Sequence, residues 1–348
     1  MTAGDVRLFL DRMVSEGTIP GAVFLGGRPG QRTEAVVAGQ AQVHGGPARP
    51  MHEDTLFDLA SLTKVVATLP AVLVLAERGD LALDDPAVRF LPGLRGERRD
   101  EITIRQLLAH TSGLPAEIKF WREYTDPGEA HLAMLQVPLE RPPGRHVVYS
   151  DIGFMLLGRV VMAVTGASLD AAVAALVTGP LGLTRTGFNP NPQQGGNLAA
   201  STEPQPDGSV PTGVVHDENA RFFGGVAGHA GLFAPASDLA RYLELAWLGR
   251  ELLSPATRSA ACRLQTEGAG GRRGLGWVLR GDAHDSLGSH WPPASATHTG
   301  FTGTSLAFDP ASGYWAVLLT NDVHFGRNRG TIRGVREAVH DRWAPPAR

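Results

Sequence analysis

Cysteine and lysine are the scarcest reactive residues in this chain of 348 residues. Cys262 is the only cysteine, which excludes an intrachain disulfide and a cysteine-based zinc site. Lys64 and Lys119 are the only two lysines among 32 Lys and Arg residues. Because arginine keeps its charge at any working pH, a side-chain amine that accepts a proton can only come from these two positions.

The chain also lacks a charge excess, a long apolar run and a leader pattern. A net charge of −3 gives no electrostatic reason to expect nucleic acid or an anionic membrane as a partner. The apolar run 65–76 ends at Glu77 and Arg78, short of a membrane span. Residues 1–5 carry no basic segment followed by an apolar core, so we expect a cytoplasmic protein, although an exported protein trimmed of its signal would look the same.

Several catalytic motifs are absent. The chain has no Gly-x-Ser-x-Gly sequence, so an α/β-hydrolase nucleophile elbow has no support. It also has no His-Glu-x-x-His sequence and no EF-hand loop, so we expect no metal site and no cofactor. The oligomeric state has no signal in the sequence.

Hydrophobic periodicity predicts strands near both ends of the chain and helices between them. The expected strands are 22–25, 33–43, 276–280, 304–309 and 314–320. The expected helices are 5–16, 61–78, 103–110, 152–165 with Asp151 as its cap, 238–248 and 329–343. Residues 189–211 are rich in Pro, Gly, Asn and Gln, which predicts a long surface loop.

This order of elements predicts an α/β (α+β) fold. One antiparallel sheet would be built from both chain ends and flanked by helices, with a mostly helical domain inserted. We predict a sheet domain from residues 1–80 and 230–348, and an inserted domain from residues 81–229.

Ser61 and Lys64 open the apolar helix and are the strongest catalytic candidates. At i and i+3 they share one helical face. A hydroxyl in the first turn lies in the positive field of the helix N-terminus, which favours a developing anion. If burial lowers the pKa of Lys64, its free amine can take the Ser61 proton, so the pair predicts a nucleophile with its own base.

Two further segments carry candidate site residues. Tyr149-Ser150-Asp151 lies between a Pro-Gly turn and a helix, where a tyrosine can pass a proton between nucleophile and leaving group. His298-Thr299-Gly300 precedes a turn and a strand, and its glycine would let a ligand approach the backbone. The Phe301 N–H, beside that of Ser61, is the candidate second donor of an oxyanion hole.

In this order and spacing, these segments resemble the serine β-lactamase and penicillin-binding-protein superfamily. The tyrosine of the second motif is typical of the class C branch, which includes esterases, D-aminopeptidases and DD-peptidases. Supporting matches are Leu83 to Pro86, Leu107 to Leu114 and Gly225 to Phe233. The resemblance implies that Ser61 is the nucleophile, that Lys64 and Tyr149 share the base and proton-shuttle role, and that His298 and Thr299 contact substrate.

Two departures from the family pattern bear on the substrate. Asp151 stands where the family often has asparagine; it either caps its helix and faces away, or faces Lys64, raises the lysine pKa and makes Tyr149 the base. His298 stands where many β-lactamases have lysine, so the third motif lacks a full charge for a substrate carboxylate.

We therefore expect a serine hydrolase that forms an acyl-enzyme on Ser61 and acts on a small-molecule ester or a D-amino-acid amide or peptide. The alternatives are a β-lactamase or penicillin-binding DD-carboxypeptidase, which would take a β-lactam or a D-alanyl peptide. A third alternative, from another class, is a non-catalytic relative that keeps the fold and binds a ligand.

Overall fold

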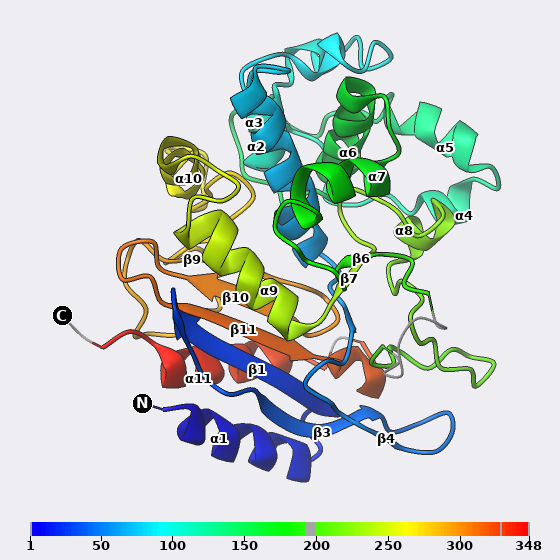
Figure 1. Ribbon diagram of the computed structural model, residues 1–348. Coiled ribbons are helices and arrows are strands. Elements are labelled where there is room, and N and C mark those ends of the chain that lie inside the picture. The colour runs from blue at the N-terminus through cyan, green and yellow to red at the C-terminus, as the bar shows by residue number, and fades with distance from the viewer. Residues whose placement is uncertain (1, 192–198, 328, 347–348) are drawn as a thin grey trace.

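A central antiparallel sheet organises the computed structural model, which describes residues 2–191, 199–327 and 329–346 (Figure 1). The strand order is β4-β3-β1-β11-β10-β9-β8, with β2 paired to β1. The strands are β1 (Gly21–Arg28), β2 (Gln31–Arg32), β3 (Val36–Gln42), β4 (Arg49–Pro50), β8 (Val278–Leu279), β9 (Ala296–Thr299), β10 (Ser305–Phe308) and β11 (Trp315–Thr320). The sheet thus joins both ends of the chain, and the expected α/β (α+β) fold is confirmed.

Strand β11 lies at the centre of the sheet and is buried along its whole length. Successive side chains of a strand point to opposite faces. Leu318 accordingly joins the apolar cluster under the N- and C-terminal helices, whereas Val317 and Leu319 join the larger cluster on the opposite face. A central strand with both faces covered explains why the sequence of β11 is continuously apolar rather than alternating.

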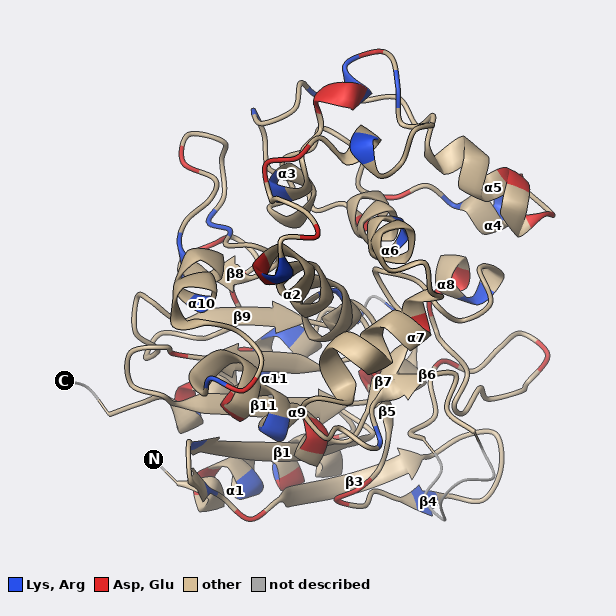
Figure 2. Ribbon diagram, turned by 45° about the horizontal axis from the view of Figure 1, so that its top comes forward, with Lys and Arg blue, Asp and Glu red and all other residues tan. Residues whose placement is uncertain are grey.

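Helices cover both faces of this sheet. Helices α1 (Ala3–Ser15) and α11 (Ile332–Trp343) lie on one face, and α9 (Ala236–Tyr242) lies on the other (Figure 1). In Figure 2, strands β3 and β9 are almost entirely tan, and most charged residues lie on helix ends and loops. The face of the sheet under α9 is packed with apolar side chains, since Leu239 and Ala240 of α9 belong to the same cluster as Val317 and Leu319.

The remaining helices form a layer above α9 (Figure 1). They are α2 (Leu69–Arg78), α3 (Ile104–Leu108), α4 (Phe120–Glu123), α5 (Pro127–Met134), α6 (Asp151–Thr165), α7 (Leu169–Val173), α8 (Glu218–Phe222) and α10 (Pro255–Cys262). A small second sheet, ordered β5-β7-β6, is built from β5 (Phe57–Asp58), β6 (Gly187–Phe188) and β7 (Leu232–Ala234). The domain boundaries near residues 80 and 229 stay a prediction.

Two local predictions were wrong. The cap of α6 is Ser150, whose side chain accepts the Gly153 N–H, and Asp151 is the first helical residue. Part of the predicted surface loop 189–211 is buried: Ser201 is fully enclosed, and its N–H donates to the Ala41 carbonyl. Residues 192–198 of that loop lie outside the described residues. In both cases the prediction concerned polar residues, and their hydrogen-bond partners follow from the folded structure rather than from residue type.

Within the described residues, no single helix is long and apolar enough to span a membrane. One bent pair, Asp151–Thr165 with Leu169–Thr178, passes that test by length and composition only.

Candidate active site

Ser61 lies in a tight turn that is held by the residues before it. Ala60 has φ = +44°, a conformation that costs a residue with a Cβ about 1 kcal/mol or more. The buried Asp58 carboxylate supports this turn, since it accepts the Ala60 N–H at 2.8 Å and the His216 N–H at 2.6 Å. The sheet strand β5 thereby presents Ser61 at the start of the following helix.

The helix after Ser61 begins with a π-helical segment, Lys64–Thr68, before α2 continues as an α-helix. The Leu69 N–H bonds to the Lys64 carbonyl, five residues back. Pro70 follows directly and has no N–H to donate, which is consistent with a widened turn at this point.

Lys64 is fully buried, and its Nζ is surrounded by acceptors. It lies 2.9 Å from Ser61 Oγ, 2.7 Å from Asp151 Oδ1 and 3.3 Å from the His229 carbonyl oxygen. An ammonium has three hydrogens and no lone pair, so three acceptors match the charged form of the lysine. Asp151 therefore faces Lys64, which answers the question that the sequence left open.

Of the two possibilities that the sequence left open for the Lys64 pKa, the contacts favour the raised one. Burial does lower this pKa, but the charges of Asp151 and Tyr149 outweigh it and raise the pKa above its usual range. The amine at position 64 is consequently protonated at neutral pH. It can donate a hydrogen bond to Ser61 Oγ, but it has no lone pair with which to accept the serine proton.

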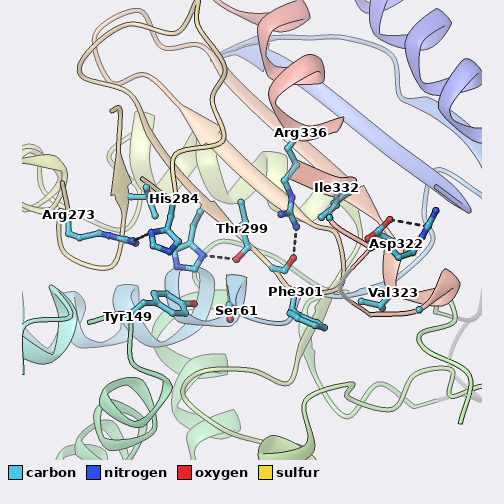
Figure 3. Close-up of a pocket in the computed structure, with 16 residues that line it drawn as sticks. Ser61, Tyr149, Arg273, His284, Thr299, Phe301, Asp322, Val323, Ile332 and Arg336 are labelled. Carbon is cyan, nitrogen blue, oxygen red and sulfur yellow. Dashed lines mark hydrogen bonds and ion pairs between the residues drawn. The ribbon is translucent and has the colours of Figure 1, made fainter. Parts of the chain in front are cut away.

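Tyr149 is positioned by His110. The His110 carbonyl accepts the Val148 N–H at 2.9 Å, its Nδ1 accepts the Ser150 N–H at 3.1 Å, and its ring packs 4.7 Å from that of Tyr149. The Tyr149 ring lies 4.9 Å from Lys64 Nζ, and its hydroxyl points toward Ser61 (Figure 3). The structure thus brings Ser61, Lys64, Tyr149 and Asp151 together.

The third predicted segment lies across the site from Tyr149. Strand β9 ends at Thr299, and the turn after it places Phe301 beside Ser61 (Figure 3). Within the described residues, neither the Ser61 N–H nor the Phe301 N–H has a hydrogen-bond acceptor. Two free backbone donors at the mouth of a cavity are what an oxyanion hole requires.

Gly300 is needed for close packing within the protein itself. A Cβ at this position would overlap the Leu59 carbonyl oxygen and Thr304 Oγ1. It is therefore the protein's own backbone, two residues before Ser61, that approaches Gly300 closely. This contact fixes the third segment against the turn that carries the nucleophile.

His298 is buried and uncharged. Burial, with help from the nearby Lys64 and Arg273 charges, holds its pKa well below the usual range. Its Nδ1 lies 3.0 Å from the Thr299 carbonyl oxygen, so an Nδ1–H can donate there. As the sequence predicted, the third segment supplies no positive charge of its own.

Ser61 lies between two cavities, and Tyr149 and Phe301 also line both of them. The first has a volume of about 370 Å³ and contains three arginines and one aspartate, namely Arg273, Arg329, Arg336 and Asp322. The second, of about 350 Å³, has four acidic and three basic lining residues: Glu117, Asp151, Asp217, Glu218, Lys119, Arg122 and Arg327. The reacting hydroxyl is therefore flanked by an arginine-rich side and a side of mixed charge.

Sequence reasoning missed Arg273. It is 2% exposed, its Nη2 lies 3.2 Å from Asp282 Oδ1 and 3.1 Å from His284 Nδ1, and its guanidinium lies 5.9 Å from the Tyr149 ring. In Figure 3 it enters the cavity beside His284. Arg273 comes from a loop with no motif, and 29 other positions are arginine, so no pattern singled it out.

His229 and Asp217 support the lysine from behind. His229 Nε2 lies 2.9 Å from Asp217 Oδ1, which also accepts the Ala220 N–H at 2.7 Å. Burial opposes ionisation of Asp217, but His229 and this hydrogen bond hold its pKa well below the usual range. These contacts fix the loop whose His229 carbonyl accepts from Lys64 Nζ.

Asp151, Asp217 and His229 also form the one candidate metal cluster among the described residues, with ligand atoms within 4.8 Å of one another. The Lys64 ammonium already lies 2.7 Å from Asp151. A cation of the protein itself thus occupies the position at which this cluster would attract one.

Residues 6–340 match the family model described as Beta-lactamase. The chain belongs to the Beta-lactamase family. A relative from Escherichia coli (strain K12), named "Putative D-alanyl-D-alanine carboxypeptidase", is 35% identical over 304 residues, which cover 78% of this chain and 70% of the relative. The predicted family resemblance is confirmed.

Solved structures agree with this family assignment. The chain is similar to EstCE1, a hydrolase with promiscuous acyltransferase activity, with 27% identity, a TM-score of 0.78 and coverage of 97% of this chain and 98% of that one. It also shares its fold with a class C β-lactamase from Rhodobacter sphaeroides, with 22% identity, a TM-score of 0.76 and coverage of 97% and 98%. This member of the Beta-lactamase family is a serine hydrolase by descent, as the sequence predicted.

Proposed function

We propose that this protein hydrolyses carboxylic esters or D-amino-acid amides through an acyl-enzyme on Ser61, with Tyr149 as the general base. The observation that carries the proposal is the state of Lys64, whose ammonium donates to Ser61 Oγ and is neutralised by Asp151. Because that lysine has no lone pair to offer, the base must be another group, and the Tyr149 hydroxyl is directed at Ser61.

In this mechanism Tyr149 acts as its phenolate beside the Lys64 ammonium. Ser61 Oγ attacks the substrate carbonyl carbon while the Tyr149 phenolate oxygen takes the serine proton and becomes a hydroxyl. The negative charge that develops on the carbonyl oxygen is stabilised by the Ser61 and Phe301 N–H groups. Tyr149 then gives the proton to the leaving group, and the carbonyl–leaving-group bond breaks. Water then attacks the carbonyl carbon of the acyl-enzyme, Tyr149 takes a proton from the water and passes it to Ser61 Oγ, and the acid product leaves. Lys64 remains an ammonium throughout.

Burst kinetics with a p-nitrophenyl ester test this function. We expect a rapid release of p-nitrophenol equal to the enzyme concentration, and a mass increase of one acyl group on the peptide that contains Ser61. A panel with nitrocefin and a D-alanyl-D-alanine peptide then ranks the substrates. If no member of the panel gives turnover or an adduct, the chain is a non-catalytic relative that keeps the fold.

A DD-carboxypeptidase is the second candidate, and Arg273 is the observation that favours it. The third motif has no lysine, yet Arg273 introduces a buried guanidinium into the arginine-rich cavity from a different segment. Among the described residues its Nη1 has no partner, so it can bind a carboxylate of the substrate. The E. coli relative carries a name of this class.

Matched esters separate these two candidates. We expect Arg273→Met to lower kcat/KM for p-nitrophenyl hemisuccinate by roughly 10-fold or more, and for p-nitrophenyl butyrate far less, because only the first bears a carboxylate. The ratio between the two substrates cancels any loss of folded protein. Arg272→Met, an exposed neighbour that does not line either Ser61 cavity, should leave that ratio unchanged. An equal loss on both esters would contradict an anion-binding role.

A further inference from the structure

Arg336 is a buried arginine on α11 that the mechanism above does not use. It is 8% exposed, and its Nη2 donates to the Gly300 carbonyl oxygen at 2.6 Å (Figure 3). Burial lowers its pKa to about 10, partly offset by the nearby Asp322 carboxylate. The guanidinium is therefore charged at neutral pH, and it contacts a backbone carbonyl beside the catalytic serine.

The carbonyl that Arg336 contacts belongs to the peptide bond whose N–H is that of Phe301. This bond is trans, as are the other described peptide bonds. In a trans peptide the C=O and N–H vectors point in opposite directions. With the Gly300 carbonyl held toward α11, the Phe301 N–H points away from α11, toward the cavity that Ser61 lines.

The Gly300–Phe301 peptide is held at several points. The Gly300 N–H donates to the Thr304 carbonyl at 2.8 Å, and a Cβ on Gly300 would overlap the Leu59 carbonyl oxygen. The Gly300 carbonyl oxygen accepts two hydrogen bonds, one from the Gly303 N–H at 3.1 Å within the turn and one from Arg336 Nη2 at 2.6 Å. Of these two donors Arg336 is the charged one, and it reaches the carbonyl from a different element, α11.

We propose that Arg336 is a positioning residue for the oxyanion hole, which polarises the Gly300–Phe301 peptide and, together with the Gly303 N–H, holds its orientation so that the Phe301 N–H is a strong, fixed donor. The inference rests on the proposed acyl-enzyme at Ser61. A positive charge on the carbonyl draws electron density from the amide, and hydrogen bonds in a chain strengthen one another. Preorganised donors of this kind need no reorientation when the oxyanion forms.

A competing role for Arg336 is direct binding of a substrate anion, because it also lines the arginine-rich cavity. The two roles differ in what they change. A positioning role affects kcat for every substrate, whether charged or neutral. An anion-binding role affects KM, and only for substrates that carry a negative charge.

The experiment compares Arg336→Met, Arg336→Lys and the control Arg333→Met on p-nitrophenyl butyrate, a neutral ester. Arg333 lies one turn earlier on α11, is exposed and pairs with Glu337 at 2.8 Å. We expect Arg336→Met to lower kcat by roughly 10- to 100-fold with little change in KM, by the size of an oxyanion-hole contribution. Arg336→Lys should recover part of the loss, and Arg333→Met should match the wild type.

The infrared carbonyl stretch of the acyl-enzyme gives a second readout. A carbonyl polarised by two N–H donors absorbs at lower frequency, so we expect the band to move to higher frequency in Arg336→Met. A folded Arg336→Met protein with unchanged kcat and an unmoved band would overturn the proposal, as would a loss confined to KM of anionic esters. If the methionine variant fails to fold, the lysine variant carries the same comparison.

Failure of this inference is distinguishable from failure of the proposed function. If the wild type forms an adduct on Ser61 but the band does not respond to Arg336, only the positioning role is lost. If the wild type forms no adduct at all, the proposed acyl-enzyme function is refuted.

Discussion

Replacing Ser61 by alanine is expected to lower kcat on a p-nitrophenyl ester by roughly 10⁴- to 10⁶-fold, since the variant cannot form the acyl-enzyme. The oxyanion donors and the base would remain, so a small residual rate above that of water is expected. Initial rates measured at substrate concentrations well above KM, together with the absence of the acyl adduct, check this result.

The fold of the Ser61→Ala protein should stay intact. The Ser61 hydroxyl accepts a hydrogen bond from Lys64, but that ammonium keeps Asp151 and the His229 carbonyl as partners. Ser254→Ala is a matched control, because it removes the serine cap of the distant helix α10. We expect it to cost about 1 kcal/mol of stability and nothing in kcat. Equal activity in Ser61→Ala and wild type would refute the nucleophile assignment.

How far the sequence predicts this site depends on whether the partners of a residue are local. Ser61 and Lys64 are one turn apart, so their contact follows from helical geometry alone. The continuous apolar sequence of β11 likewise predicts a central strand without knowledge of its neighbours. Such features come from spacing within one element.

Features that depend on distant segments could not be predicted in the same way. The Asp151 carboxylate raises the pKa of Lys64, although it lies 87 positions later in the chain. No local sequence pattern shows whether the Asp151 side chain faces Lys64 or points away from it. The need for Gly300 comes from a carbonyl at Leu59, and its peptide is held by Arg336 from the last helix. The buried Arg273 and Arg336 could not be distinguished from surface arginines, because nearly every basic residue in this sequence is arginine.

The choice of Tyr149 rather than Lys64 as the base leads to the second large effect. Tyr149→Phe removes the phenolate oxygen that receives the serine proton, and we expect a fall in kcat of about 10³-fold. The ring itself should stay packed against His110, 4.7 Å away, so the protein should fold normally. Tyr124→Phe, which alters a tyrosine packed on Phe120 in the helical layer, is the matched control and should leave kcat unchanged.

Asp151→Asn distinguishes the two possible bases by the sign of its effect. Without the carboxylate, the burial that opposes charge on Lys64 is no longer outweighed, so the lysine pKa falls. Suppose first that Tyr149 is the base and needs the Lys64 ammonium beside it. Lys64 then loses its proton at a lower pH in the variant, so the basic limb of the pH profile of kcat moves to lower pH. If Lys64 were the base, the acid limb would move to lower pH instead and the rate at neutral pH would rise. We expect the first outcome, because every contact of Lys64 Nζ in the folded protein is one that a charged donor makes.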